Sequence, residues 1–220
     1  MSIARIHPVK YLLISCLTLS TIRIFIEWDM IYLFLLWNLF LAWVPYAIAQ
    51  TAYKAKSKVT YFAALGIVLL FIPNASYLIT DFVHFRQGLR INLWFDLVLF
   101  FTYAFTGLML MMYTIDILAQ SISSRISARM AQIFQFSIFP IIGCGIYVGR
   151  IERWNSWDVF VHPFSFISDM VQIVFSPQIT EFISFSMLFG GFCAMFYLFL
   201  KLIHQNHDSM PYDQTTHPIK

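Results

Sequence analysis

Six apolar stretches, each near twenty residues long, recur along the 220-residue chain. A helix needs about 20 mostly apolar residues to cross the hydrocarbon core of a bilayer. The pattern therefore predicts an all-α, polytopic membrane helix bundle, built as a single transmembrane domain over residues 1–203 with a short cytoplasmic tail over residues 204–220. The expected spans are residues 9–26, 30–49, 59–80, 94–116, 131–149 and 182–203.

Composition excludes several other classes of protein. The chain is 60% hydrophobic and only 11% charged, with a mean hydropathy of +0.72, which is too little charge to cover a water-soluble domain of this length. We therefore expect the lipid bilayer to be its surroundings. No basic stripe or recognition motif predicts nucleic-acid binding. The three cysteines, Cys16, Cys144 and Cys193, lie far apart inside apolar runs, which is typical of small buried residues rather than of a disulfide framework.

The positive charges predict an orientation in the membrane. Lys and Arg are enriched in cytoplasmic loops, so the favoured topology places both termini in the cytoplasm of a bacterial plasma membrane. That topology puts nine Lys and Arg inside and five outside. The inner group is Arg5, Lys10, Lys54, Lys56, Lys58, Arg125, Arg129, Lys201 and Lys220, and the outer group is Arg23, Arg86, Arg90, Arg150 and Arg153.

One apolar segment on the expected outer side, residues 164–177, is too short to span. Its polar residues recur on one helical face, and apolar residues such as Phe164, Ile167 and Val171 fill the other. This pattern predicts an interfacial amphipathic helix lying on the outer surface of the bilayer. A lid packed on the bundle is the alternative interpretation.

The stretch FIPNASYLITDFVHF, residues 71–85, combines an apolar run with hydrogen-bonding and titratable groups. If the helix continues past Pro73, then Asn74, Tyr77, Asp81 and His84 fall on one face. Such a stripe is expected to face other helices or a wet cavity rather than lipid. We expect Pro73 to kink or interrupt the span and to free carbonyl groups near residue 69 for polar partners.

Two further segments are expected to meet this stripe. In span four, Asp96, Tyr103 and Thr106 share one face, and the short connection from Asp81 to Asp96 predicts neighbouring antiparallel helices. Two carboxylates at similar depth would repel each other unless a cation lies between them. The segment GRIERWNSWDVFVHP, residues 149–163, supplies Arg150 and Arg153, which could neutralise Asp81 and Asp96 or bind a phosphate. Its other polar and aromatic residues suit a membrane interface or a sugar or lipid headgroup: Trp154, Asn155, Trp157, Asp158 and His162.

The blocks PNASYLITDFVH, WFD and GRIERWNSWDVFVHP resemble, in order and spacing, those of a family of bacterial membrane proteins catalogued as domain of unknown function 1361. The resemblance runs from about span two to span six. It implies a multi-pass bacterial membrane protein of about this size. The family has no known activity, so the resemblance implies no catalytic or binding residue.

Three functional hypotheses remain open from the residues alone. The first is a structural, sensory or accessory protein that partners another membrane protein and contains a closed network of paired charges. The second is an outward-facing enzyme acting on a lipid-linked or cell-envelope substrate, with Asp81, His84, Asp96 and Asp158 as candidate catalytic residues. A divalent metal is conceivable there, with Asp81, His84 and His162 as candidate ligands. The third is a transporter of a small solute, coupled to an ion, which would need a polar pathway continuing past Tyr103 and Thr106. The candidate binding residues are Asn74, Tyr77, Arg150, Arg153, Trp154, Asn155, Trp157 and His162.

Overall fold

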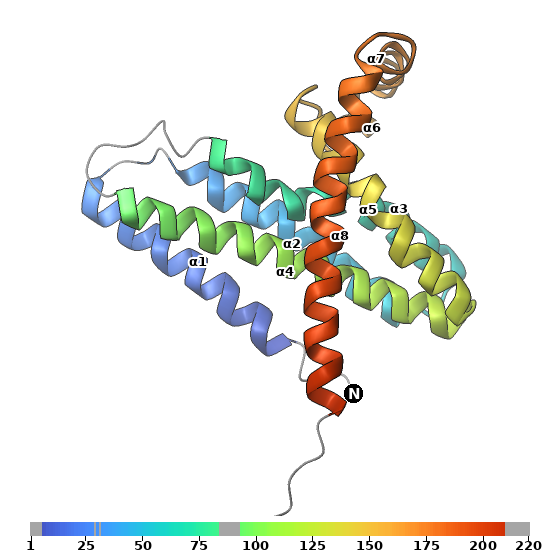
Figure 1. Ribbon diagram of the computed structural model, residues 1–220, viewed down its shortest axis with the longest axis horizontal. Coiled ribbons are helices and arrows are strands. Elements are labelled where there is room, and N and C mark those ends of the chain that lie inside the picture. The colour runs from blue at the N-terminus through green and yellow to red at the C-terminus, as the bar shows by residue number, and fades with distance from the viewer. Residues whose placement is uncertain (1–5, 29, 31, 84–92, 210–220) are drawn as a thin grey trace, which may run out of the picture.

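A computed structural model describes residues 6–28, 30, 32–83 and 93–209 of the chain, and the described part is helical (Figure 1). Six helices are long and apolar enough to cross a membrane, which confirms the predicted fold class. They are α1 (Ile6–Glu27), α2 (Leu33–Lys54), α3 (Lys58–Thr80), α4 (Leu93–Arg125), α5 (Ala128–Arg150) and α8 (Ile179–Ser209). Two shorter helices, α6 (Asp158–Val161) and α7 (Pro163–Phe175), lie between α5 and α8.

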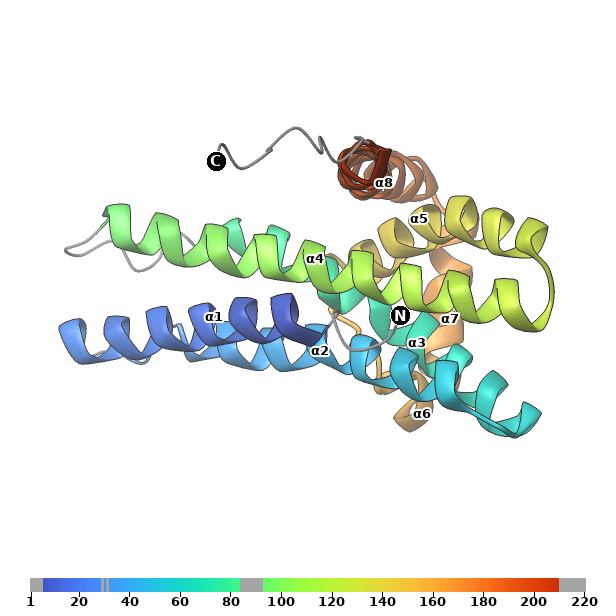
Figure 2. The same ribbon diagram turned by 90° about the horizontal axis from the view of Figure 1, so that it is seen from below.

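The helices α1, α2 and α4 run alongside one another, and α3 packs against both α2 and α4 (Figure 1 and Figure 2). Helix α5 packs against α3, α4 and α8. Helix α8 crosses the other helices steeply, standing upright in Figure 1 and seen almost end-on in Figure 2. It packs mainly on α5 and therefore stands at the edge of the bundle.

Much of the outside of the bundle is apolar. Large hydrophobic side chains remain exposed along the long helices, for example Phe101 on α4, Phe136 on α5 and Leu188 on α8. A water-soluble protein rarely exposes apolar surface on this scale, whereas a lipid bilayer covers it without cost. The exposed residues thus support the assignment of these helices as membrane spans.

One end of the bundle, the Arg125 end, holds the tight α2–α3 and α4–α5 turns. Ser57 and Ser127 cap α3 and α5, because their hydroxyl oxygens accept hydrogen bonds from the backbone N–H groups of Val59 and Met130, both at 3.2 Å. Arg125 Nη2 donates to two carbonyl oxygens at the end of α2, that of Tyr53 at 3.1 Å and that of Ala55, the residue after the helix, at 2.5 Å. These bonds satisfy carbonyl groups that a helix end leaves without partners.

Helix α7 presents its apolar face outward. Within α7 only Ile173 is buried, and Phe164 and Phe175 are each 86% exposed. Trp154 Nε1 ties the helix to the preceding segment through Asp169 Oδ2 at 3.1 Å. An exposed apolar face agrees better with the expected interfacial helix than with a lid, because a lid would bury that face against the bundle.

Candidate functional site

The opposite end of the bundle, the Asp81 end, gathers the polar residues singled out by the sequence. Helix α3 continues through Pro73, and Asn74, Tyr77 and Asp81 lie on one of its faces, as the spacing predicts. All three contact α5 or the segment that follows it. Asn74 Nδ2 donates to Ser156 Oγ at 3.0 Å, and the Tyr77 hydroxyl donates to the Gly145 carbonyl at 3.3 Å. His84 lies outside the described residues.

Pro73 does not break α3, and a polar contact lies close to it. The Ser156 hydroxyl donates to the Leu70 carbonyl oxygen at 3.1 Å. Proline removes the N–H that would bond the carbonyl of residue 69, one position earlier. The Ser156 hydroxyl is therefore bonded one residue away from the carbonyl that Pro73 frees. It comes from the segment after α5, which becomes attached to the middle of α3.

Asp81 is fully buried and has two donors. Arg150 Nη2 lies 2.6 Å from its Oδ1, and Asn38 Nδ2 donates to its Oδ2 at 2.8 Å. The carboxylate thereby links α3 to α5 and α2. A buried carboxylate is tolerated when its charge is paired and its oxygens are bonded, and both conditions hold here.

Arg150 is engaged on several sides. Its Nε donates to Thr80 Oγ1 at 2.9 Å, and Nη2 also donates to the Tyr77 carbonyl at 3.3 Å. The guanidinium carbon lies 5.2 Å from the centre of the Tyr77 ring, within the range of a cation–π interaction. The planar fork of donors is thus directed at α3, and the phosphate-binding role considered for Arg150 has no geometric support.

Asp96 belongs to a different cluster. Arg23 Nε of α1 lies 2.5 Å from Asp96 Oδ1, and the Tyr32 hydroxyl donates to Oδ2 at 3.2 Å. The two carboxylates therefore share no partner among the described residues, and the expectation that Arg150 or Arg153 neutralises both is wrong for Asp96. The reason is that the polar face of α4 is turned toward α1 rather than toward α5.

The other polar residues on this face of α4 also contact α1. The Tyr103 hydroxyl lies 2.6 Å from Ser20 Oγ, and Thr106 Oγ1 lies 3.3 Å from Cys16 Sγ. Tyr103 and Thr106 are fully buried. Their side chains form a contact between α1 and α4, so they do not extend the Asp81 cluster toward the Arg125 end.

Tyr32 lies just before α2 and shows the electrostatic effect of this second cluster. Burial raises the pKa of Tyr32 to about 12, and the negative charge of Asp96 adds to that effect by opposing a phenolate beside it. The positive charge of Arg23 acts in the opposite direction and only partly offsets it. Tyr32 is therefore a neutral hydrogen-bond donor to Asp96 at physiological pH.

The segment from residue 151 to residue 162 forms its own local structure. Asp158 Oδ2 accepts from the backbone N–H and the side-chain amide of Asn155, at 2.7 and 3.0 Å. Asp158 is thereby occupied in closing a turn and is not bonded to the Asp81 cluster. Trp157 packs edge-on against Trp37 of α2, with ring centres 6.3 Å apart. Arg153 has a positive φ of 60° and is exposed, as is His162.

A groove of about 230 Å³ opens between α3, α5 and this segment. Its walls are mostly apolar, with a few uncharged polar side chains at intervals. The lining residues most relevant to binding are Pro73, Asn74, Tyr77, Cys144, Trp154 and Asn155. The structure thus brings four candidate binding residues to one groove: Asn74, Tyr77, Trp154 and Asn155. Arg150, Arg153, Trp157 and His162 do not line it.

The metal hypothesis finds little support in the arrangement of donors. Within the ranges that the structure describes, no three His, Cys, Asp or Glu side chains are placed to share an ion. Asp81 is already bonded to an arginine and an amide, and His162 is exposed on a different segment. The third candidate ligand, His84, falls outside the described ranges.

Sequence reasoning missed three residues that complete the two clusters. Asn38 is the second donor to Asp81, Ser156 is the partner of Asn74, and Tyr32 is the second donor to Asp96. Asn38 had a detectable signal, because it stands alone as a polar residue in the apolar run LFLLWNLFLAW. An isolated amide at membrane depth is costly unless it is bonded to a neighbouring helix.

Six apolar spans around buried, paired charges define a multi-span membrane protein. The chain belongs to the family described as "Protein of unknown function (DUF1361)", whose model matches residues 37–196, from within α2 to within α8. No curated protein and no solved structure matches the chain.

Proposed function

We propose that this protein is a non-catalytic sensory or accessory membrane protein that binds an amphipathic cell-envelope molecule in the groove at its Asp81 end. We place that end outside a bacterial plasma membrane, with both termini in the cytoplasm, on the basis of the Lys and Arg distribution. The observation that carries the proposal is the contrast between two neighbouring features. Asp81 and Asp96 are each bonded to an arginine and a second donor, while the groove lined by Tyr77, on the same face of α3 as Asp81, stays open.

The saturated carboxylates argue against the enzyme alternative. A general acid or base must reach the proton that it transfers, in a position accessible to substrate. Asp81 and Asp96 are 0% and 1% exposed and are bonded to side chains from other helices. Asp158 is used by its own turn. The transporter alternative needs a pathway past Tyr103 and Thr106, and both side chains are instead used in contacts with α1.

The chemistry of the groove favours an amphipathic ligand with an uncharged polar headgroup. Leu69, Ile141 and Val148 offer apolar surface for a hydrocarbon chain. Trp154 and Asn155 stand where the groove meets the segment after α5, and an indole ring beside amide groups suits the face and hydroxyl groups of a sugar. We therefore propose a glycolipid, or a lipid-linked sugar, as the class of ligand.

Native mass spectrometry of the detergent-purified protein tests this proposal with a diglucosyl diacylglycerol as the probe. The same diacylglycerol without sugar is the control lipid. We expect the sugar-bearing lipid to be retained at about tenfold lower concentration, which corresponds to roughly 1.4 kcal/mol of headgroup recognition. Equal retention of the two lipids would mean that the groove holds hydrocarbon without recognising a headgroup, and would overturn the proposal.

Two variants of α5 locate the binding. Cys144 lines the groove, so Cys144→Phe is expected to fill it and to abolish the preference for the sugar-bearing lipid. Ile133 is exposed on the same helix and does not line this groove, so Ile133→Phe is the matched control and is expected to retain the preference. Conversion of the glycolipid by the parent protein, lost in Asp81→Asn, would instead establish the enzyme alternative.

The proposed orientation has its own test. Alkaline phosphatase is active only outside the cytoplasm, so a fusion after residue 155 is expected to be active and a fusion after residue 220 inactive. The reverse pattern would place the Asp81 end in the cytoplasm.

A further inference from the structure

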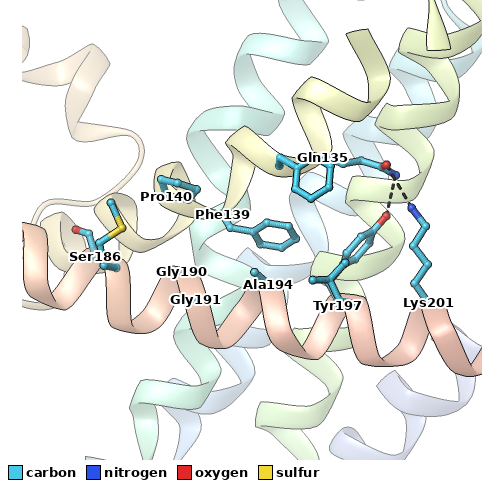
Figure 3. A pocket seen from close by; sticks show the side chains of 12 residues that line it. Gln135, Phe139, Pro140, Ser186, Gly190, Gly191, Ala194, Tyr197 and Lys201 are labelled. Atoms are coloured by element: carbon cyan, nitrogen blue, oxygen red, sulfur yellow. Dashed lines mark hydrogen bonds between the residues drawn. The ribbon is translucent and has the colours of Figure 1, made fainter. Parts of the chain in front are cut away.

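A second groove, distinct from the one at the Asp81 end, lies between α5 and α8 (Figure 3). It has a volume of about 250 Å³. Phe136, Phe139 and Pro140 form its α5 wall, and Met187 and Leu198 form its α8 wall. Since α8 stands at the edge of the bundle with an apolar exterior, the groove opens on surface that the bilayer covers.

Two adjacent glycines of α8 give the groove its depth, in different ways. A Cβ at Gly190 would come within 2.6 Å of the Phe139 carbonyl oxygen, so this glycine lets α8 approach α5 closely. A Cβ at Gly191 would meet nothing within 4 Å. Gly191 lines the groove, so its missing side chain contributes open space rather than a helix contact.

The ammonium group of Lys201 lies at one end of this apolar groove. Lys201 Nζ donates to Gln135 Oε1 at 3.3 Å and lies 5.5 Å from the centre of the Tyr197 ring (Figure 3). Gln135 Nε2 donates in turn to the Tyr197 hydroxyl, and that hydroxyl donates to Asp116 Oδ1, both at 2.8 Å. This chain of bonds holds the ammonium at the mouth of the groove. Among the described residues, no carboxylate lies within salt-bridge distance of Lys201.

We propose that this groove binds an anionic phospholipid, with the phosphate beside Lys201 and one acyl chain along Gly191. Charge complementarity and the position of the groove between two membrane spans favour this ligand. Basic pockets between transmembrane helices bind anionic headgroups, and an ammonium with unused donors pairs with a phosphate. The groove is smaller than a pocket for a drug-sized molecule, and its narrow apolar walls suit a single hydrocarbon chain. The lipid comes from the leaflet at the Arg125 end.

A buried hydroxyl at the other end of the groove serves as an internal control. Ser186 is 4% exposed, and its Oγ has no hydrogen-bond partner among the described residues. It lies fifteen positions before Lys201 on α8, or about 22 Å along the helix axis. That separation is too long for one phosphate to contact both residues, so the proposal assigns Ser186 no role in headgroup binding.

The test is thermal unfolding of the full-length protein in a neutral detergent, followed by tryptophan fluorescence. The additions are dioleoyl phosphatidylglycerol, dioleoyl phosphatidylcholine and inorganic phosphate, each at the same concentration. We expect phosphatidylglycerol alone to raise Tm, by about 3 °C when it is present at roughly ten times its Kd. Equal shifts with both lipids, or a shift with inorganic phosphate alone, would overturn the proposal.

Variants assign the shift to the groove. Lys201→Gln and Gly191→Leu are expected to abolish the difference between the two lipids, by removing the charge and filling the space. Lys201→Arg is expected to keep it. Gly66→Leu is the matched control for Gly191→Leu, because Gly66 of α3 also has nothing within 4 Å of its added Cβ and does not line the groove. Ser186→Ala is expected to keep the difference as well.

Two outcomes would identify a different occupant. If Gly191→Leu folds and keeps the phosphatidylglycerol-specific shift, the lipid binds elsewhere. The other outcome has three parts: the parent protein is a dimer by native mass spectrometry, Gly191→Leu makes it monomeric, and neither lipid shifts Tm. In that case the groove receives a helix of a second copy rather than a lipid. Either result overturns the proposal without affecting the one for the Asp81 end, since the probes and variants differ.

Discussion

Arg150 at the end of α5 forms an ion pair with Asp81 at the end of α3, at 2.6 Å, and both residues also bond other parts of the bundle. The side chain of Asp81 is 0% exposed and that of Arg150 is 24% exposed. The pair therefore joins three helices, α2, α3 and α5, at one point. Removing Arg150 would leave the fully buried Asp81 carboxylate without its counter-charge, and removing Asp81 would leave the mostly buried Arg150 guanidinium unpaired.

The first prediction concerns the stability of this pair. Asp81→Asn and Arg150→Gln are each expected to lower the free energy of unfolding, by about 3 kcal/mol, because a single substitution leaves a buried charge unpaired. The double variant is expected to lose less than the sum of the two single losses, since it contains neither charge. Thermal or chemical unfolding in detergent measures all three variants.

A stabilising effect of Asp81→Asn would contradict this interpretation. Sites that bind or transform ligands often store repulsion, so that neutralising one charge raises stability. A higher Tm for Asp81→Asn would therefore support the enzyme alternative.

The second prediction concerns the independence of the two carboxylates. Asp81 is bonded to Arg150 and Asn38, whereas Asp96 is bonded to Arg23 and Tyr32. Sites that share no partner usually have additive effects, to within about 0.5 kcal/mol. We expect the losses of unfolding free energy in Asp81→Asn and Asp96→Asn to add in the double variant. A double variant less stable than the sum of the losses predicts would show that the carboxylates repel each other in a shared site.

The sequence predicted the fold because membrane spans follow from local composition. A run of about 20 apolar residues needs no knowledge of its neighbours, and the six expected spans correspond to six long helices. The shared face of Asn74, Tyr77 and Asp81 also followed from local spacing, whereas α3 is not interrupted at Pro73. Even the ends were close, although α4 extends to Arg125 and α8 to Ser209, beyond the expected 116 and 203.

The partners of the charges did not follow from the sequence, because they depend on how each helix is rotated. Asp96 was expected beside Asp81, since a short connection separates them along the chain. Nothing in the spacing showed that the α4 face with Asp96, Tyr103 and Thr106 is turned toward α1. Arg23 and Asp96, for example, are separated by 73 residues along the chain. Local residue spacing does not predict which residues pair across helices over such a distance.

The third prediction concerns the close packing of α3 and α5. A Cβ at Gly149 would overlap the Tyr77 hydroxyl, and a Cβ at Gly145 would overlap the ring of Pro73. Gly145 and Gly149 are therefore points of close contact between α3 and α5. We expect Gly149→Ala to lower unfolding free energy by about 1–3 kcal/mol, through overpacking and displacement of the Tyr77 side chain.

Gly66→Ala is the control for that measurement. Its added Cβ meets nothing within 4 Å, and alanine favours the helix over glycine by up to about 1 kcal/mol. We expect Gly66→Ala to leave stability unchanged or to increase it. Equal effects of the two alanines would show that Gly149 is not a packing contact.

The fourth prediction concerns pH and Tyr32. Its pKa is about 12 in the folded protein and 10.0 in its ordinary state, so the folded state disfavours the phenolate. A raised pKa contributes stability that is fully present below pH 10 and is lost as the pH rises toward 12. We expect the parent protein to lose stability more steeply than Tyr32→Phe between pH 10 and pH 12, because phenylalanine has no proton to lose. The comparison cancels the titration of the other tyrosines, which both proteins share. Parallel stability curves for the two proteins over this range would show that the folded state does not raise the pKa of Tyr32.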